Sequence, residues 1–171
     1  DGGDLKQRIS TTIAERDAVR YIKHIAGALA KIHEVGILHR DLKPGNIMLR
    51  ADDTIALIDF GLARRMRLQM ELTDEGEIFG TPYYMSPEQG HAGAVDHRSD
   101  IYSLGVIFYE MLTGDKPFLA DTARGIIYQH AQTPIPLLSA RLAKCLAVLN
   151  LMLAKEPDNL RQTADEVVDW L

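Results

Sequence analysis

The longest helical pattern in the chain runs from Thr12 to about Val35. Apolar residues recur there three and four positions apart, on one face of an amphipathic helix; they are Ile22, Ile25, Ala26, Leu29, Ala30 and Ile32. Thr12 and Glu15 have the spacing of a capping box at its start, and Gly36 is the residue type that ends helices. We expect one face of this helix to be buried under the loop that follows it.

A second helical segment, within Asp96–Gly114, is apolar nearly all round. A helix without a polar face belongs at the centre of a domain. We therefore expect this segment to be the most buried helix of the chain.

Residue types that cap helices mark the starts of five shorter helical segments. They are Asp4, Ser86 with Pro87 after it, Asp121, Ser139, and Thr163 with Glu166 after it. The helix that follows Asp121 is expected to reach about His130, and the one that follows Ser139 to reach about Lys155.

One region has the pattern of a β-hairpin. Two short apolar segments, Ile47–Arg50 and Ile55–Ile58, flank a connection whose Asp52 and Asp53 suit a tight turn. The chain is therefore predicted to be mainly α-helical with one small hairpin.

Composition and charge narrow the classes of function. A length of 171 residues suits one domain, and a net charge of −5 gives no electrostatic reason to expect a nucleic-acid partner. The most apolar long stretch, residues 135–154, contains Arg141 and Lys144, so it predicts a buried helix and no membrane segment. The single cysteine, Cys145, excludes an intrachain disulfide and fits a cytoplasmic setting, and any membrane anchor would lie outside these residues.

Two short motifs carry the candidate chemistry. Residues 39–46 read His-Arg-Asp-Leu-Lys-Pro-Gly-Asn, and an Asp-Phe-Gly at residues 59–61 begins thirteen residues after the first motif ends. Alone, the second motif would be a turn that closes a strand, but its spacing from the first predicts a phosphoryl-transfer site. Such a site needs oxygen ligands for Mg²⁺ and a cation for phosphate. The side chains that supply them are Asp41, Lys43, Asn46 and Asp59.

Two histidines near the first motif, His33 and His39, invite a metal-binding interpretation. A zinc site would need further ligands, and none lies at a suitable spacing. We therefore expect structural roles for both.

The resemblance to a known family rests on these motifs together with residues 80–89, which read Gly-Thr-Pro-Tyr-Tyr-Met-Ser-Pro-Glu-Gln. The whole chain resembles the C-terminal lobe of a protein serine/threonine kinase, most closely the bacterial type. The resemblance implies a helical bundle whose small β-hairpin carries the catalytic and metal-binding loops. Residues 1–171 would then form only the C-terminal lobe of the catalytic domain. ATP and Mg²⁺ (or Mn²⁺) are the implied cofactors, and a protein is the implied substrate.

The same resemblance implies roles for individual residues. Asp41 would orient the substrate hydroxyl and accept its proton, and Lys43 would stabilise the phosphoryl group during transfer. Asn46 and Asp59 would bind the magnesium ion, and Thr81 would support the catalytic aspartate through its hydroxyl. A lysine at position 43 resembles serine/threonine rather than tyrosine kinases.

Further positions match parts of the family that bind nucleotide or hold the fold. Met48 would lie beneath the adenine, and Asp4 would lie near the ribose. Glu88 and Arg161 would form a buried ion pair, and Asp100 would steady the catalytic loop from the central helix. Glu88 is thus expected to be structural and not catalytic.

Regulation is implied by Arg40, because kinases with this arginine are usually switched by a phosphate on the activation loop, which a guanidinium binds through two hydrogen bonds. Thr73 is the only hydroxyl residue in residues 62–79, and Glu75 and Glu77 lie nearer the usual phosphorylation position. We expect these two glutamates to substitute in part for the phosphate.

The glycine-rich loop, the strand lysine and the helix glutamate of a kinase N-terminal lobe have no counterpart in this sequence. The chain is therefore expected to be part of a longer protein, with the missing N-terminal β lobe as its first partner. Alone, it is expected to bind ATP weakly and to be weakly active or inactive. Apolar surface that the other lobe would cover favours self-association.

Three other functions compete with that of an active kinase. A pseudokinase scaffold would have lost a metal ligand or the catalytic aspartate, yet Asp41, Asn46 and Asp59 are all present. A small-molecule phosphotransferase would share the loop but lack residues 80–88, a platform whose presence favours protein substrates. An interaction protein that binds through residues 62–79, which are predicted to form a long surface loop, would show no magnesium-dependent binding of nucleotide.

Overall fold

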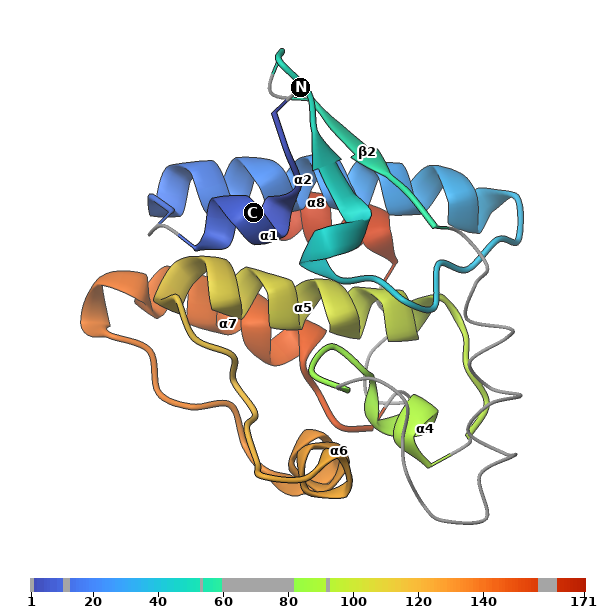
Figure 1. Cartoon of the computed structure of the whole chain (residues 1–171), viewed down its shortest axis with the longest axis vertical. Helices are drawn as coiled ribbons and strands as arrows, with labels where there is room; N and C mark the ends of the chain where they lie inside the picture. The colour runs from blue at the N-terminus through green and yellow to red at the C-terminus, as the bar shows by residue number, and fades with distance from the viewer. Residues whose placement is uncertain (1, 11–12, 53, 60–81, 92, 157–162) are drawn as a thin grey trace.

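The computed structural model of the chain describes residues 2–10, 13–52, 54–59, 82–91, 93–156 and 163–171 (Figure 1). These residues are mainly helical with one two-stranded sheet, as the sequence predicts. The longer helices are α2 (Glu15–Glu34), α5 (His97–Thr113), α6 (Ala123–Gln132) and α7 (Ala143–Met152). The shorter ones are α1 (Leu5–Ile9), α4 (Pro87–Gly90) and α8 (Ala164–Trp170), with the 3-10 turns η1 (Pro44–Asn46) and η2 (Ala140–Leu142). The strands are β1 (Ile47–Leu49) and β2 (Ile55–Leu57).

Helix α5 is the centre of the domain, which confirms the prediction from its apolar pattern. Every residue from Ser99 to Leu112 is buried. Helix α5 contacts α2 on one side and α7 on the other, and α2 in turn contacts α8 (Figure 1). A Cβ on Gly105 would lie 2.8 Å from the Cβ of Met152, so α5 and α7 can approach this closely only because residue 105 has no side chain.

Most of the predicted helix starts are confirmed, and two are wrong. Asp4 caps α1 by accepting a hydrogen bond from the backbone N of Gln7 at 2.8 Å. Helix α6 is capped by Thr122 and not by Asp121, because the Thr122 hydroxyl accepts from the backbone N of Gly125 at 3.0 Å.

The second error concerns α2, which begins after Ala14 without a side-chain cap. The Ala14 carbonyl accepts from the backbone N of Asp17 and Ala18, and acidic Glu15 and Asp17 occupy the first turn. Negative charge in a first turn is favourable for the helix dipole. The predicted partner Thr12 lies outside the described residues.

The apolar stretch of residues 135–154 folds into η2 and α7. Ser139 precedes η2 as predicted, but α7 ends at Met152, before the predicted end at Lys155. Cys145 is buried on α7. None of the helices in the described part of the chain is both long and apolar enough to cross a membrane.

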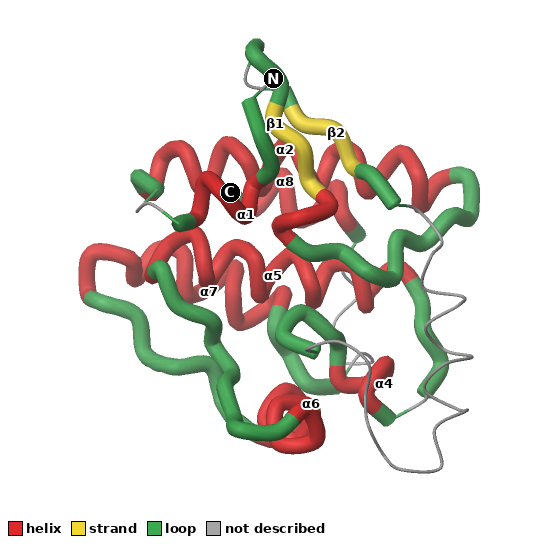
Figure 2. Tube along the Cα trace, in the orientation of Figure 1, coloured by secondary structure: helices red, strands yellow, loops and turns green. Residues whose placement is uncertain are grey.

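The hairpin is antiparallel as predicted, with Ile47 opposite Leu57. Residues 2–4 run along the free edge of β1 (Figure 2): Gly2 N donates to Leu49 O at 3.1 Å, and Leu49 N donates to Gly3 O at 2.9 Å. A Cβ on Gly2 would lie 2.8 Å from Leu49 O, so glycine allows this approach. The start of the chain is thereby fixed beside the strand that follows the 39–46 motif.

Candidate active site

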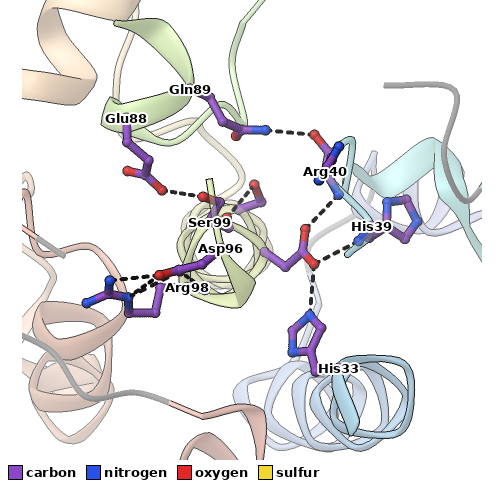
Figure 3. Close-up of polar contacts among 10 residues, drawn as sticks. His33, His39, Arg40, Glu88, Gln89, Asp96, Arg98 and Ser99 are labelled. Carbon is purple, nitrogen blue, oxygen red and sulfur yellow. Dashed lines mark hydrogen bonds and ion pairs between the residues drawn. The ribbon is translucent and has the colours of Figure 1, made fainter. Parts of the chain in front are cut away.

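The loop that carries Asp41 is anchored by Asp100, a buried carboxylate in the first turn of α5 (Figure 3). The side chain of Asp100 is 1% exposed, and its Oδ1 accepts from Arg40 N at 2.7 Å. Its Oδ2 accepts from His39 N and from His33 Nε2, both at 2.8 Å. A buried carboxylate is costly without such partners. These hydrogen bonds therefore fix the loop to both α5 and α2.

Three polar side chains meet just after this anchor. Lys43 Nζ lies 2.7 Å from Asp41 Oδ2, and Asn46 Nδ2 donates to Asp41 O at 2.9 Å and to Asp41 Oδ2 at 3.3 Å. Asp41 keeps 24% of its side-chain surface exposed. Its Oδ1 has no hydrogen-bond partner among the described residues, so this oxygen is available to a substrate group.

Asp59 is placed by the residue before it. Ile58 N donates to Asn46 O at 3.0 Å, and Ile58 O accepts from His39 Nε2 at 3.1 Å. The end of β2 is thus bonded to both ends of the 39–46 motif. Asp59 follows with an exposed side chain and a φ of 63°, which is rare for a residue other than glycine.

This donor set suits a magnesium ion. Asn46 uses its amide nitrogen for Asp41, which leaves the amide oxygen for a ligand. Asp59 adds an exposed carboxylate. Within the described ranges, no group of three or more His, Cys, Asp and Glu residues could hold a metal ion. A site with one carboxylate and one amide oxygen fits Mg²⁺, which keeps waters and takes its other ligands from substrate phosphates.

The two residues predicted to contact the nucleotide are neighbours in the structure. Asp4 and Met48 face each other in an isolated antiparallel bridge. Met48 is half-buried between buried Ile47 and Leu49, so its side chain lies on the face of β1 away from the core. Asp4 Oδ1 also caps α1, which is a structural role in addition to the ribose contact that the family resemblance implies.

A protein-family profile described as "Protein kinase domain" matches residues 1–170 of the chain. The chain belongs to this family. The serine/threonine-protein kinase PknB of Mycobacterium leprae is 38% identical over 98% of the chain, and that of Mycolicibacterium smegmatis is 41% identical over 98%. PknL of Mycobacterium tuberculosis, another serine/threonine-protein kinase, is 40% identical over 82% of the chain. The chain spans 28% of the length of the two PknB relatives and the match covers 35% of PknL.

Protein kinases use ATP with Mg²⁺, and in this family the aspartate of the first motif acts on the substrate hydroxyl while its asparagine and the second motif bind the metal. The structure brings Asp41, Lys43 and Asn46 together and joins Asp59 to them through Ile58. Five other predicted residues lie outside the described residues: Thr73, Glu75, Glu77, Thr81 and Arg161. The Glu88–Arg161 pair therefore stays a prediction; Glu88 itself accepts a hydrogen bond from the Ser99 hydroxyl.

Sequence reasoning missed a buried polar cluster under residues 82–85 of this kinase domain. Tyr84 Oη donates to Glu110 Oε2 at 2.7 Å, and Ser103 Oγ donates to Tyr84 O at 2.6 Å. Lys116 Nζ lies 2.9 Å from Glu110 Oε1 and 4.9 Å from the centre of the Tyr83 ring. Burial and the Glu110 hydrogen bond raise the pKa of Tyr84, which keeps its hydroxyl protonated as the donor. The sequence feature that could have indicated this cluster is the presence of polar Ser103 and Glu110 among the apolar residues of α5.

A second missed cluster joins α5 and α6. Tyr102 Oη lies 3.0 Å from His130 Nδ1 and 3.3 Å from Lys155 Nζ, which stacks over the Phe118 ring at 3.9 Å. Burial, and then the Lys155 charge, lower the pKa of His130 to about 4. Burial lowers the pKa of Lys155 to about 8. His130 is therefore neutral, and its Nδ1 can accept a hydrogen bond from the Tyr102 hydroxyl.

Proposed function

We propose that this chain carries the catalytic loop of a protein serine/threonine kinase, which transfers the γ-phosphoryl group of ATP to serine and threonine hydroxyls of proteins. The observation that carries this proposal is the position of Asp41. Its carboxylate is held by Lys43 and Asn46, on a loop that Asp100 fixes from a buried helix. Orientation of an attacking hydroxyl requires a fixed carboxylate with an available oxygen, and Asp41 Oδ1 has no hydrogen-bond partner among the described residues.

Each side chain of the cluster has a distinct part in this mechanism. Asp41 Oδ1 accepts the hydrogen bond of the substrate hydroxyl and directs its oxygen toward the phosphorus. Lys43, 2.7 Å from the other oxygen of Asp41, donates to the phosphoryl oxygens as charge develops on them. Asn46 Oδ1 and Asp59 would hold Mg²⁺, which supplies neutralisation of the phosphate charge when it is bound.

Protein substrates are supported by two features of the chain. Residues 80–88 follow the family pattern for the platform that receives a peptide. In the described part of this platform, Tyr84 is hydrogen-bonded to Ser103 and Glu110 of α5, and Lys116 pairs with Glu110. The PknB and PknL relatives bear the name serine/threonine-protein kinase. We infer the same class of substrate for this chain.

We also infer that residues 1–171 form the C-terminal lobe and that an N-terminal lobe in the same longer protein completes the ATP site. In this arrangement Met48 lies beneath the adenine, Asp4 near the ribose, and Thr81 supports Asp41 through its hydroxyl. The antiparallel bridge between Asp4 and Met48 supports a shared role. Without the second lobe the chain binds ATP weakly and transfers phosphate poorly.

Regulation is proposed to act through Arg40, whose side chain is exposed beside the anchored loop. Glu75 and Glu77 substitute in part for an activating phosphate, and Thr73 is the available phosphorylation site. In a version of the chain that is extended upstream through the proposed N-terminal lobe, here called the two-lobe protein, the double variant Glu75→Ala, Glu77→Ala should lose kinase activity. Unchanged activity in that variant, together with complete loss in Thr73→Ala, would remove the glutamates from the proposal.

The test of the proposed function compares the 171-residue chain with a version extended upstream through the other lobe. Both are incubated with Mg²⁺ and γ-labelled ATP, with a generic basic protein as acceptor and with a choline and aminoglycoside mixture as the alternative. We expect label on serine and threonine of the protein only, and only with the extended version. Label on the small molecules, or none at all with a folded extended protein, would overturn the proposal.

A further inference from the structure

The backbone of Arg40, the residue before Asp41, is held in an unusual conformation. Arg40 has a φ of 65°, in the left-handed region that residues other than glycine rarely adopt. Such a residue keeps its conformation only when its surroundings impose it. Since Asp41 follows directly, whatever holds this peptide also sets the direction of the Asp41 side chain.

Two side chains hold the backbone of Arg40, one at its N–H group and the other at its carbonyl oxygen (Figure 3). Asp100 Oδ1 accepts from Arg40 N at 2.7 Å, and Gln89 Nε2 donates to Arg40 O at 2.9 Å. The first contact comes from α5 and the second from α4. Gln89 therefore fixes the carbonyl of the Arg40–Asp41 peptide, which the Asp100 contact leaves free to rotate.

The amide oxygen of the Gln89 side chain also has hydrogen-bond partners. Its Oε1 accepts from Ser86 N at 3.0 Å and lies 3.1 Å from Ser86 Oγ, which closes the first turn of α4. The contact with Ser86 N thus orients the side-chain amide of Gln89, and its Nε2 then donates to Arg40 O. A glutamate could cap α4 equally well, but its carboxylate cannot donate to Arg40 O at neutral pH.

We propose that Gln89 is a positioning residue for Asp41: its amide group fixes the Arg40–Asp41 peptide plane and so the direction of the Asp41 carboxylate. The inference rests on the proposed kinase function for its catalytic consequence. Its structural part, the restraint of the loop by Gln89, stands on the two hydrogen bonds alone.

The test uses Gln89→Glu in the two-lobe protein, because this change keeps the cap and removes the donor to Arg40 O, while the negative charge that it adds is also added by the control variant. Gln129→Glu is the matched control: Gln129 also lies on a helix and both accepts from Leu119 N and donates to Leu119 O, away from the site. We expect Gln89→Glu to lower kcat about 10- to 100-fold with KM values for ATP and peptide within about twofold of the wild type. Gln129→Glu should leave kcat and both KM values unchanged.

A second measurement separates this inference from the proposed function. Hydrogen exchange of a peptide covering residues 39–46 is followed in the 171-residue chain, where no catalysis is needed. We expect Gln89→Glu to speed exchange in this peptide about tenfold or more, and Gln129→Glu to leave it unchanged. An inactive wild-type two-lobe protein would refute the kinase proposal and leave exchange to decide the role of Gln89. A Gln89→Glu variant with unchanged kcat or with unchanged exchange would overturn the inference.

Discussion

Replacement of Asp100 by asparagine probes the contact on which the active loop depends. The carboxylate accepts three hydrogen bonds between 2.7 and 2.8 Å while its side chain is 1% exposed. Asparagine has the same shape but offers one acceptor and one donor in place of two acceptors. In the better orientation its oxygen keeps the contacts with His39 and His33, and its NH₂ group then faces the N–H of Arg40.

The expected cost follows from these contacts. One hydrogen bond to a charged acceptor is lost, and such bonds contribute about 1.5 to 3 kcal/mol each. The two that remain become bonds to a neutral acceptor, which are weaker by roughly half. Asparagine is less costly to bury than a carboxylate, which offsets part of this loss. We therefore expect Asp100→Asn to lower the free energy of unfolding by about 3 kcal/mol.

Urea unfolding of the 171-residue chain, followed by circular dichroism, measures this change. With a slope of about 2 kcal/mol per molar urea, the midpoint should fall by about 1.5 M. Asp96→Asn is the control, because Asp96 caps the same helix but is 43% exposed, and its loss should cost about 1 kcal/mol or less. A midpoint for Asp100→Asn equal to that of the control, with an unchanged slope, would refute the anchoring argument.

Three further predictions test other parts of the fold. Burial lowers the pKa of His130 to about 4, so between about pH 6.5 and 4 this histidine is protonated in the unfolded chain but neutral in the folded chain. The free energy of unfolding should therefore fall by on the order of 3 kcal/mol over this range. Urea unfolding of His130→Asn should not show this fall. Gly105→Ala should cost about 1 to 3 kcal/mol, because its Cβ would meet Met152, whereas Gly27→Ala in α2, where no atom lies within 4 Å, should be stabilising; equal melting temperatures would count against this packing. Burial and then the nearby Glu15 raise the pKa of Cys145 to about 11, so iodoacetamide at pH 8 should label the folded chain roughly 100-fold more slowly than the unfolded one, and similar rates would place the thiol at the surface.

Periodicity predicted the elements that the core requires. The segment that is apolar nearly all round forms the buried helix α5. The two segments Ile47–Arg50 and Ile55–Ile58 contain the strands of the hairpin. Helix starts were less certain wherever two capping residue types are adjacent. At Asp121 and Thr122 the local backbone decides which side chain reaches the first N–H groups, and sequence does not reveal it.

The site was predicted from motif spacing and family resemblance, since periodicity alone contains no information on it. Asp41, Asn46 and Asp59 follow from the two motifs. Contacts between distant segments could not be predicted, because the partners of Gln89 and Glu110 are 49 and 26 positions away. Polar residues inside an apolar helix such as Glu110 indicate that a partner exists but do not identify it.

The most direct test of the account is the rate of phosphoryl transfer by the chain extended upstream through the proposed N-terminal lobe, with Asp41 replaced by asparagine. The variant keeps the shape of the side chain and removes the acceptor charge. We predict a fall in kcat of at least about 100-fold, with unchanged KM for ATP and an unchanged circular dichroism spectrum. A kcat within a few-fold of the wild type would contradict the assignment of Asp41 as the group that orients the substrate hydroxyl, and with it the proposed mechanism.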